Sequence, residues 1–204
     1  GFGADPVPEP TGPRGGLASS PAGLRGGHQA PAQLPADLVA FTGRQAEIDT
    51  LGAALTGPAK SSVIVIVGTA GVGKTTLALK LADTLKSSYR DAQFYLDLKG
   101  VSAQPLTSME AMAHIIRAYY PDVTLPGSEA QMSGLYQSAL EGKRALILMD
   151  NAKDSAQVES LIPPANCLIL VTSRQHFTLP GLFAKSLNIM TPTESRELLL
   201  RIAP

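Results

Sequence analysis

The sequence has 204 residues, 44% of them hydrophobic, which suffices for one α/β domain with a buried core and a tail. Its 17 basic residues balance 17 acidic ones, which argues against a chain that binds DNA or a membrane mainly through its charge. The one cysteine, Cys167, excludes an internal disulfide and lies in an apolar run, which predicts a buried thiol in a reducing cytoplasm.

The beginning of the chain differs in composition from the rest. Residues 1–36 contain 7 of the 16 prolines and 8 of the 19 glycines and show no hydrophobic period. This composition predicts a flexible linker over residues 1–34 and a folded domain over residues 35–204. No apolar stretch is long enough to span a bilayer, and the first residues lack the pattern of a signal peptide. We therefore expect a cytoplasmic protein with no membrane partner.

Hydrophobic periodicity predicts strands that alternate with helices through the rest of the chain. The first strand, Val63 to Val67, is an unbroken β-branched run, as expected of a strand buried on both faces of a parallel sheet. Strands are predicted over residues 63–67, 93–98, 145–149, 168–171 and 186–189, and helices over 44–55, 77–82, 108–120, 129–141, 155–161 and 192–202. The alternation predicts an α/β fold, a three-layer α/β/α sandwich around a mostly parallel five-stranded sheet.

The residues after the first strand have the pattern of a phosphate-binding loop. Gly68 to Thr75 fits G-x-x-x-x-G-K-[ST], with a strand before it and a helix-forming run after it. Glycines allow the main chain to adopt positive φ angles and to approach a ligand closely. The N–H groups around Gly71, Val72 and Gly73 are therefore expected to converge on phosphate oxygens at the start of the helix.

The side chains at the end of this loop predict the binding of ATP or ADP with Mg²⁺. Lys74 is expected to reach the β- and γ-phosphates, Thr75 to bind Mg²⁺ through its hydroxyl, and Thr76 to lie near the α-phosphate. A loop that only connected a strand to a helix would not explain a lysine beside the positive end of the helix dipole.

The third predicted strand ends in Asp150, where ATPases of this kind place a carboxylate that binds magnesium. The alternative is an aspartate that simply caps a turn, but the phosphate loop upstream favours the metal-binding role. The next residue is Asn151, where many such enzymes carry an acid that polarises the attacking water. An amide orients water but cannot accept its proton, so we expect slow hydrolysis. Asp154 is expected to cap the next helix rather than to supply the missing acid.

Arg174 follows the fourth predicted strand, at the edge of an α/β sheet where ligands bind. We expect it to contact the γ-phosphate, and the alternative is an arginine exposed to solvent. The predicted catalytic residues are Lys74, Asp150, Asn151 and Arg174, and the predicted metal ligands are Thr75 and Asp150.

With these motifs together, the chain resembles the nucleotide-binding domain of STAND-type signal-transduction ATPases, the NB-ARC group, from Leu34 onward. Residues 41–47 resemble the hhGRxxE box of that group, which implies that Phe41, Thr42 and Arg44 border the adenine. Residues 170–174 resemble its sensor strand. The sequences of residues 41–44 and 148–152 are most similar to those of large SARP-type (AfsR-like) regulators of antibiotic pathways in actinobacteria.

The resemblance implies a P-loop NTPase fold of the ASCE/STAND type and an ATP/ADP-responsive switch with weak ATPase activity, within a larger transcriptional regulator. The nucleotide is expected to control self-association and activation, and DNA is expected to be bound only by domains outside this chain. Helical and winged-helix subdomains are expected to follow residue 204.

Other functions of a phosphate loop are open at this point. A small-molecule kinase would need an acceptor pocket and a mobile arginine-rich lid, for which Arg174 and Arg90 are the obvious candidates. A GTPase would need Asp-x-x-Gly after the third strand, where this chain has Asp150-Asn-Ala-Lys. A STAND-type signalling ATPase outside transcription is a further alternative.

Overall fold

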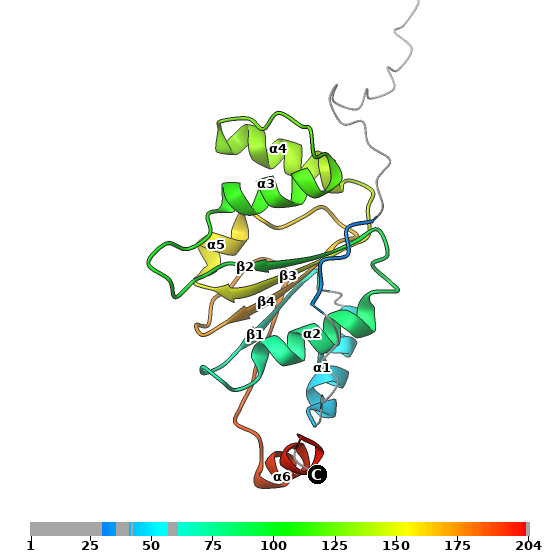
Figure 1. Ribbon diagram of the computed structural model, residues 1–204, viewed down its shortest axis with the longest axis vertical. Coiled ribbons are helices and arrows are strands. Elements are labelled where there is room, and N and C mark those ends of the chain that lie inside the picture. The colour runs from blue at the N-terminus through cyan, green and yellow to red at the C-terminus, as the bar shows by residue number, and fades with distance from the viewer. Residues whose placement is uncertain (1–29, 36–40, 42, 57–60, 203–204) are drawn as a thin grey trace, which may run out of the picture.

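Five parallel strands form the centre of the described protein. The computed structural model describes residues 30–35, 41, 43–56 and 61–202 (Figure 1). The strands are β1 (Val63–Val67), β2 (Ala92–Asp97), β3 (Ala145–Ala152), β4 (Leu168–Ser173) and β5 (Leu182–Ser186). Their order in the sheet is β2-β3-β4-β1-β5, and every neighbouring pair is parallel. The carboxyl ends of all these strands therefore lie at one edge of the sheet.

Helices cover both faces of the sheet. They are α1 (Gln45–Thr56), α2 (Lys74–Leu85), α3 (Ser108–Tyr119), α4 (Glu129–Leu140), α5 (Ser155–Glu159) and α6 (Pro192–Ile202). Figure 1 shows α3 and α4 on one side of the sheet and α1 and α2 on the other, with α6 beyond the sheet. The predicted three-layer α/β/α sandwich is thereby confirmed. None of the described helices is long and apolar enough to cross a membrane.

The unbroken apolar run of β1 contributes side chains to two hydrophobic cores. Val63, Val65 and Val67 belong to the core beneath α3 and α4, whereas Ile64 and Ile66 belong to the core beneath α1 and α2. Successive side chains of a strand point to opposite faces, so a strand covered on both faces must be apolar at every position. This requirement is why β1 shows no polar alternation in the sequence.

The single cysteine lies in the core, as predicted. Cys167 is 3% exposed, and its sulfur lies 3.4 Å from the carbonyl oxygen of Lys143. Burial raises the pKa of the thiol. Because the thiolate is the reactive form, Cys167 is a core side chain and not a nucleophile at neutral pH.

The fifth strand is displaced from its predicted position. The sequence predicts a strand over residues 186–189, but β5 covers residues 182–186 and pairs with β1 from Val63 to Val67. Leu187 donates one more main-chain hydrogen bond to Val67, and the chain then leaves the sheet, with Ile189 83% exposed. An edge strand is only partly buried, so its apolar pattern is weak.

Main-chain pairing begins a few residues before the predicted domain boundary. Gln33 donates to the carbonyl of Gln93 at 2.8 Å, and Gln93 donates to the carbonyl of Pro31 at 2.7 Å, so this segment runs parallel to β2. The predicted boundary between residues 34 and 35 falls just after this segment. Most of the predicted linker, residues 1–29, lies outside the described residues.

Candidate nucleotide-binding site

The phosphate loop joins β1 to α2 at the carboxyl edge of the sheet. Gly71 has a φ of 75° and Gly73 a φ of 96°, angles that residues with a side chain rarely adopt. Gly73 is the N-cap of α2, and its carbonyl accepts the first helical hydrogen bond from Leu77 at 2.9 Å. The free N–H groups of the first turn therefore point into the loop, where they can bind phosphate oxygens.

Lys74 occupies the first position of α2 and folds back over the loop. Its side chain is 8% exposed, and Nζ donates to the carbonyl of Thr69 at 2.7 Å. Burial lowers the pKa of Lys74, the charge of Arg174 lowers it further, and the charge of Asp150 opposes both. The two cations and the carboxylate that the sequence predicts thus lie close enough to affect one another.

Thr75 and Asp150 meet at the end of the loop, as the predicted metal site requires. The Thr75 hydroxyl donates to Oδ1 of Asp150 at 2.8 Å, and Asp150 is 4% exposed. A hydroxyl and a carboxylate are oxygen ligands of the kind that Mg²⁺ binds beside substrate phosphates. The donor set therefore fits a magnesium ion, which would neutralise charge on the phosphates when bound.

Two further side chains hold Asp150 and were not predicted from the sequence. Thr172 of β4 donates to Oδ1, and the Tyr95 hydroxyl of β2 donates to Oδ2 at 3.1 Å. Both residues come from strands that neighbour β3 in the sheet. Thr172 belongs to the strand that resembles a sensor strand, but the contacts of both residues with Asp150 follow from the strand order, which the local sequence does not record.

Asn151 lies beside Asp150 in an unusual conformation. Its φ is 57°, in the left-handed region that asparagine tolerates better than most residues. Its side-chain Nδ2 lies 3.2 Å from Oδ1 of Asp97 and 3.4 Å from Oδ2 of Asp150. The amide nitrogen therefore faces two carboxylates. Asp154 instead caps α5, where its Oδ1 accepts the N–H of Gln157 at 3.1 Å.

Arg174 directly follows β4 at the same edge of the sheet. Its side chain is exposed. It borders a cavity of about 80 Å³ that is also lined by Asn151 and by residues of the turn after β2. Its charge contributes to the lowered pKa of Lys74, and its contact with the γ-phosphate stays a prediction.

A second cavity, of about 230 Å³, lies beside the loop. Its lining residues are Phe41, Arg44, Gly71, Val72, Gly73, Thr76, Met190 and Leu198. The sequence predicted the first six of these as nucleotide contacts. It missed Met190 and Leu198, which belong to the chain after β5. Thr42, also predicted here, lies outside the described residues.

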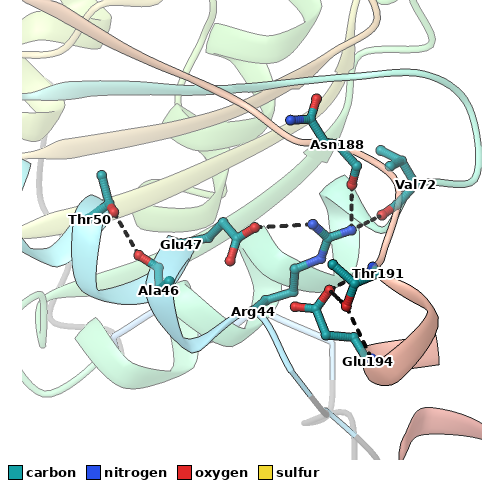
Figure 2. Close-up of polar contacts among 8 residues, drawn as sticks. All are labelled: Arg44, Ala46, Glu47, Thr50, Val72, Asn188, Thr191 and Glu194. Carbon is teal, nitrogen blue, oxygen red and sulfur yellow. Dashed lines mark hydrogen bonds and ion pairs between the residues drawn. The ribbon is translucent and has the colours of Figure 1, made fainter. Parts of the chain in front are cut away.

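Arg44 ties together the walls of this cavity (Figure 2). Its side chain is 5% exposed, and Nη2 donates to the carbonyls of Asn188 at 2.6 Å and Val72 at 3.4 Å. Nη1 pairs with Glu47 at 3.1 Å. The guanidinium is thus bound to the phosphate loop, to α1 and to the segment after β5. Arg44 lines the cavity, as the resemblance implied, but its guanidinium makes these protein contacts.

The first turn of α6 rests on the same region. Thr191 and Glu194 exchange hydrogen bonds at the helix start, with the main-chain N–H of Thr191 donating to Glu194 at 2.8 Å. These bonds lower the pKa of Glu194, and Arg44 lowers it further. A capping interaction of this type fixes where a helix begins. It therefore also fixes Leu198, one turn later, over the cavity.

The AAA ATPase domain family matches residues 40–174, which include the phosphate loop, Asp150 and Arg174. The chain belongs to the AAA ATPase domain family. Two relatives of this AAA ATPase domain are proteins called regulatory protein AfsR. The one from Streptomyces griseus is 39% identical over 178 residues, and the one from Streptomyces coelicolor is 38% identical over 182 residues.

The predicted likeness to AfsR-like regulators is therefore confirmed. Each alignment covers 84% of this chain but 18% of the relative, so the AAA ATPase domain described here spans about a fifth of their length. A solved structure with the same fold is that of Drosophila ORC bound to DNA. Its TM-score is 0.52 at 14% identity, and the match covers 84% of this chain and 48% of that one.

Proposed function

We propose that this domain is the nucleotide switch of a larger transcriptional regulator. It binds ATP or ADP with Mg²⁺ and hydrolyses ATP slowly to ADP and phosphate. The observation that carries the proposal is the meeting of Lys74, Thr75 and Asp150 at the carboxyl edge of the sheet, with Arg174 nearby. In such sites the protein acts mainly by positioning the phosphates and stabilising charge.

The cavity beside the loop supports the binding of a base at this end of the nucleotide. Its lining includes the apolar side chains of Phe41, Val72, Met190 and Leu198. Flat apolar rings bind between side chains of this kind, with a few polar groups to fix their orientation. Adenine is the base that we propose, because the family is one of ATPases.

The position of Asn151 supports slow hydrolysis. Its amide replaces the acid that would take a proton from water, and its nitrogen faces Asp97 and Asp150. A rate well below the roughly 10 s⁻¹ median of enzymes is expected. Slow turnover suits a switch, because the ATP-bound form then lasts long enough for other domains to respond to it.

Titration calorimetry with ATP, ADP and GTP tests the proposal, together with a phosphate-release assay without any acceptor. Lys74→Ala should weaken ATP binding by about 2–5 kcal/mol, the cost of removing a buried charged partner. Lys86→Ala is the matched control, because Lys86 lies at the other end of the same helix in an exposed ion pair with Asp83. Equal affinity of wild type and Lys74→Ala for ATP would contradict the proposal.

We also propose that the nucleotide controls self-association of the cytoplasmic full-length regulator and that other domains of that protein bind DNA. The AfsR-like relatives support this reading, since the domain is a small part of each of them. Sedimentation of the full-length protein with ATP or ADP tests it. The same sedimentation profile with both nucleotides would contradict the switch.

A further inference from the structure

Asp97 stands directly beside Asp150 on the face of the sheet that carries the phosphate loop. β2 and β3 are paired in register, with Asp97 opposite Asp150. Side chains two apart on a strand share a face, so Tyr95 and Asp97 point to the same side. Tyr95 reaches Asp150 at 3.1 Å, which identifies that side as the one where the loop threonine, Thr75, also contacts Asp150.

The side chain of Asp97 is fixed at this edge. Its Oδ1 accepts the N–H of Lys99 at 2.9 Å and the side-chain Nδ2 of Asn151 at 3.2 Å. It is exposed, in contrast to Asp150. A water molecule can reach a carboxylate at the surface, whereas the Asp150 carboxylate is buried among its hydrogen-bond donors.

The main chain around Asp97 is locked to the chain around Asn151. Leu98 donates to the carbonyl of Asp150 at 2.8 Å, and Gly100 donates to that of Asn151 at 2.8 Å. A Cβ on Gly100 would lie 2.4 Å from the Asn151 carbonyl oxygen, so the two turns pack without room for any side chain there. Asp97 and Asn151 therefore keep their relative position, as a catalytic pair must.

We propose that Asp97 is the carboxylate that accepts the proton of the attacking water and that Asn151 is its positioning residue. In this step a bond forms between the water oxygen and the γ-phosphorus. The bond from that phosphorus to the bridging oxygen breaks, and ADP leaves with the electron pair. The proton of the water passes to Asp97 and then to solvent. The neighbouring strand thus supplies a carboxylate in place of the acid that is absent at position 151, and the slow hydrolysis proposed above is the rate that this carboxylate sustains.

This inference rests on the proposed ATPase activity, and a single substitution tests the role of Asp97 separately from ATP binding. Asp97→Asn removes the base but keeps an oxygen that can accept from Lys99 and Asn151. We expect the rate of phosphate release to fall by about 100-fold or more, the usual contribution of a general base. The affinity for ATP, measured by calorimetry, should stay within about twofold, because Asp97 acts after binding.

Asp154→Asn is the matched control. Asp154 is also an aspartate beside this edge, but it caps α5, and asparagine caps helices equally well. Its rate should match that of the wild type. Asp97→Asn with an unchanged rate would overturn the inference, as would a parallel loss of ATP affinity, which would make Asp97 a binding residue. A wild type that binds ATP without hydrolysing it would overturn the inference, and one that does not bind ATP would overturn the proposed function itself.

Discussion

Asp150 is held by donors from four side chains. Thr75 and Thr172 donate to one oxygen, and Tyr95 and Asn151 to the other. A buried carboxylate needs such partners, because a charge removed from water without hydrogen bonds is costly. The donors also orient both oxygens. Because Thr75 belongs to the phosphate loop, its hydrogen bond also aligns the loop with the carboxylate.

The Tyr95 phenol gives this network a measurable pH dependence. Burial and the charge of Asp150 raise its pKa from 10.0 to about 12. A raised pKa means that the folded protein holds the proton more tightly than the unfolded chain does. The stabilisation from Tyr95 is therefore complete below about pH 10 and is lost as the pH rises towards about 12.

We expect Tyr95→Phe to lower the free energy of unfolding near pH 8 by about 1 kcal/mol, the net contribution of one hydrogen bond. The difference from wild type should shrink above about pH 10, where the phenol ionises in the unfolded chain but keeps its proton in the folded protein. Urea titrations at both pH values measure it. The other buried tyrosines are common to both proteins and cancel in the difference. A constant difference across this range would contradict the prediction.

We propose that Arg174 distinguishes ATP from ADP. Lys74 and the loop can hold the β-phosphate of either nucleotide, whereas Arg174 extends from a different strand. A ligand shifts a switch only through its different affinity for the two states. We expect Arg174→Ala to weaken ATP by about 1.5–3 kcal/mol, the value of a hydrogen bond to a charged group, and ADP far less.

Paired calorimetric titrations of both nucleotides check this expectation. Arg90→Ala is the control, because Arg90 is also exposed but precedes β2, at the opposite edge of the sheet. Equal losses for ATP and ADP would mean that Arg174 binds the β-phosphate or supports the fold. No loss for either would make it an ordinary surface arginine.

At the scale of elements, the chain from the end of β5 into α6 forms part of the cavity beside the phosphate loop. Met190 and Leu198 come from this part of the chain, and Arg44 holds it through the carbonyl of Asn188 (Figure 2). The same guanidinium binds Val72 in the phosphate loop. One buried side chain therefore couples the position of α6 to the loop.

Arg44→Lys tests this coupling. A lysine keeps the charge but cannot reach Glu47, Val72 and Asn188 at once, because its ammonium is a single point and not a planar fork. We expect a loss of about 2–3 kcal/mol in unfolding free energy, since buried acceptors lose their partner. ATP and ADP should weaken together, because the base cavity is shared. Gln45→Ala, at an exposed position next along the chain, is the control, and nucleotide affinity unaffected by Arg44→Lys would contradict the coupling.

The phosphate loop and Asp150 could be predicted because each belongs to a motif of consecutive residues. An apolar strand, a glycine loop and a helix lie side by side in the sequence, and so do Leu146 to Asp150. The position of β5 could not be predicted, because its partner is β1 and its own pattern is only partly buried. Tyr95, Asp97 and Leu198 were missed for a similar reason. Their roles arise from strand register and from packing between distant segments, which no local pattern records.

At the scale of the whole molecule, one edge of the sheet is partly covered by the chain itself. β2 is the outer strand on that side, and residues 31–33 pair with it through Gln93. His114 of α3 adds a contact to Gln33 at 2.8 Å. β5 is the outer strand at the other edge.

We expect the short segment before residue 35 to protect the protein against aggregation. An uncovered outer strand offers unpaired N–H and C=O groups to any other chain, and edge-to-edge association begins there. A protein that starts at residue 30 should remain monodisperse, whereas one that starts at residue 36, close to the boundary that composition suggests, should form larger particles over time. Light scattering on the two fragments at equal concentration compares them, and equal behaviour would show that the segment protects nothing. If the two fragments differ as expected, a cut placed by composition alone removes the segment that keeps copies of this domain apart.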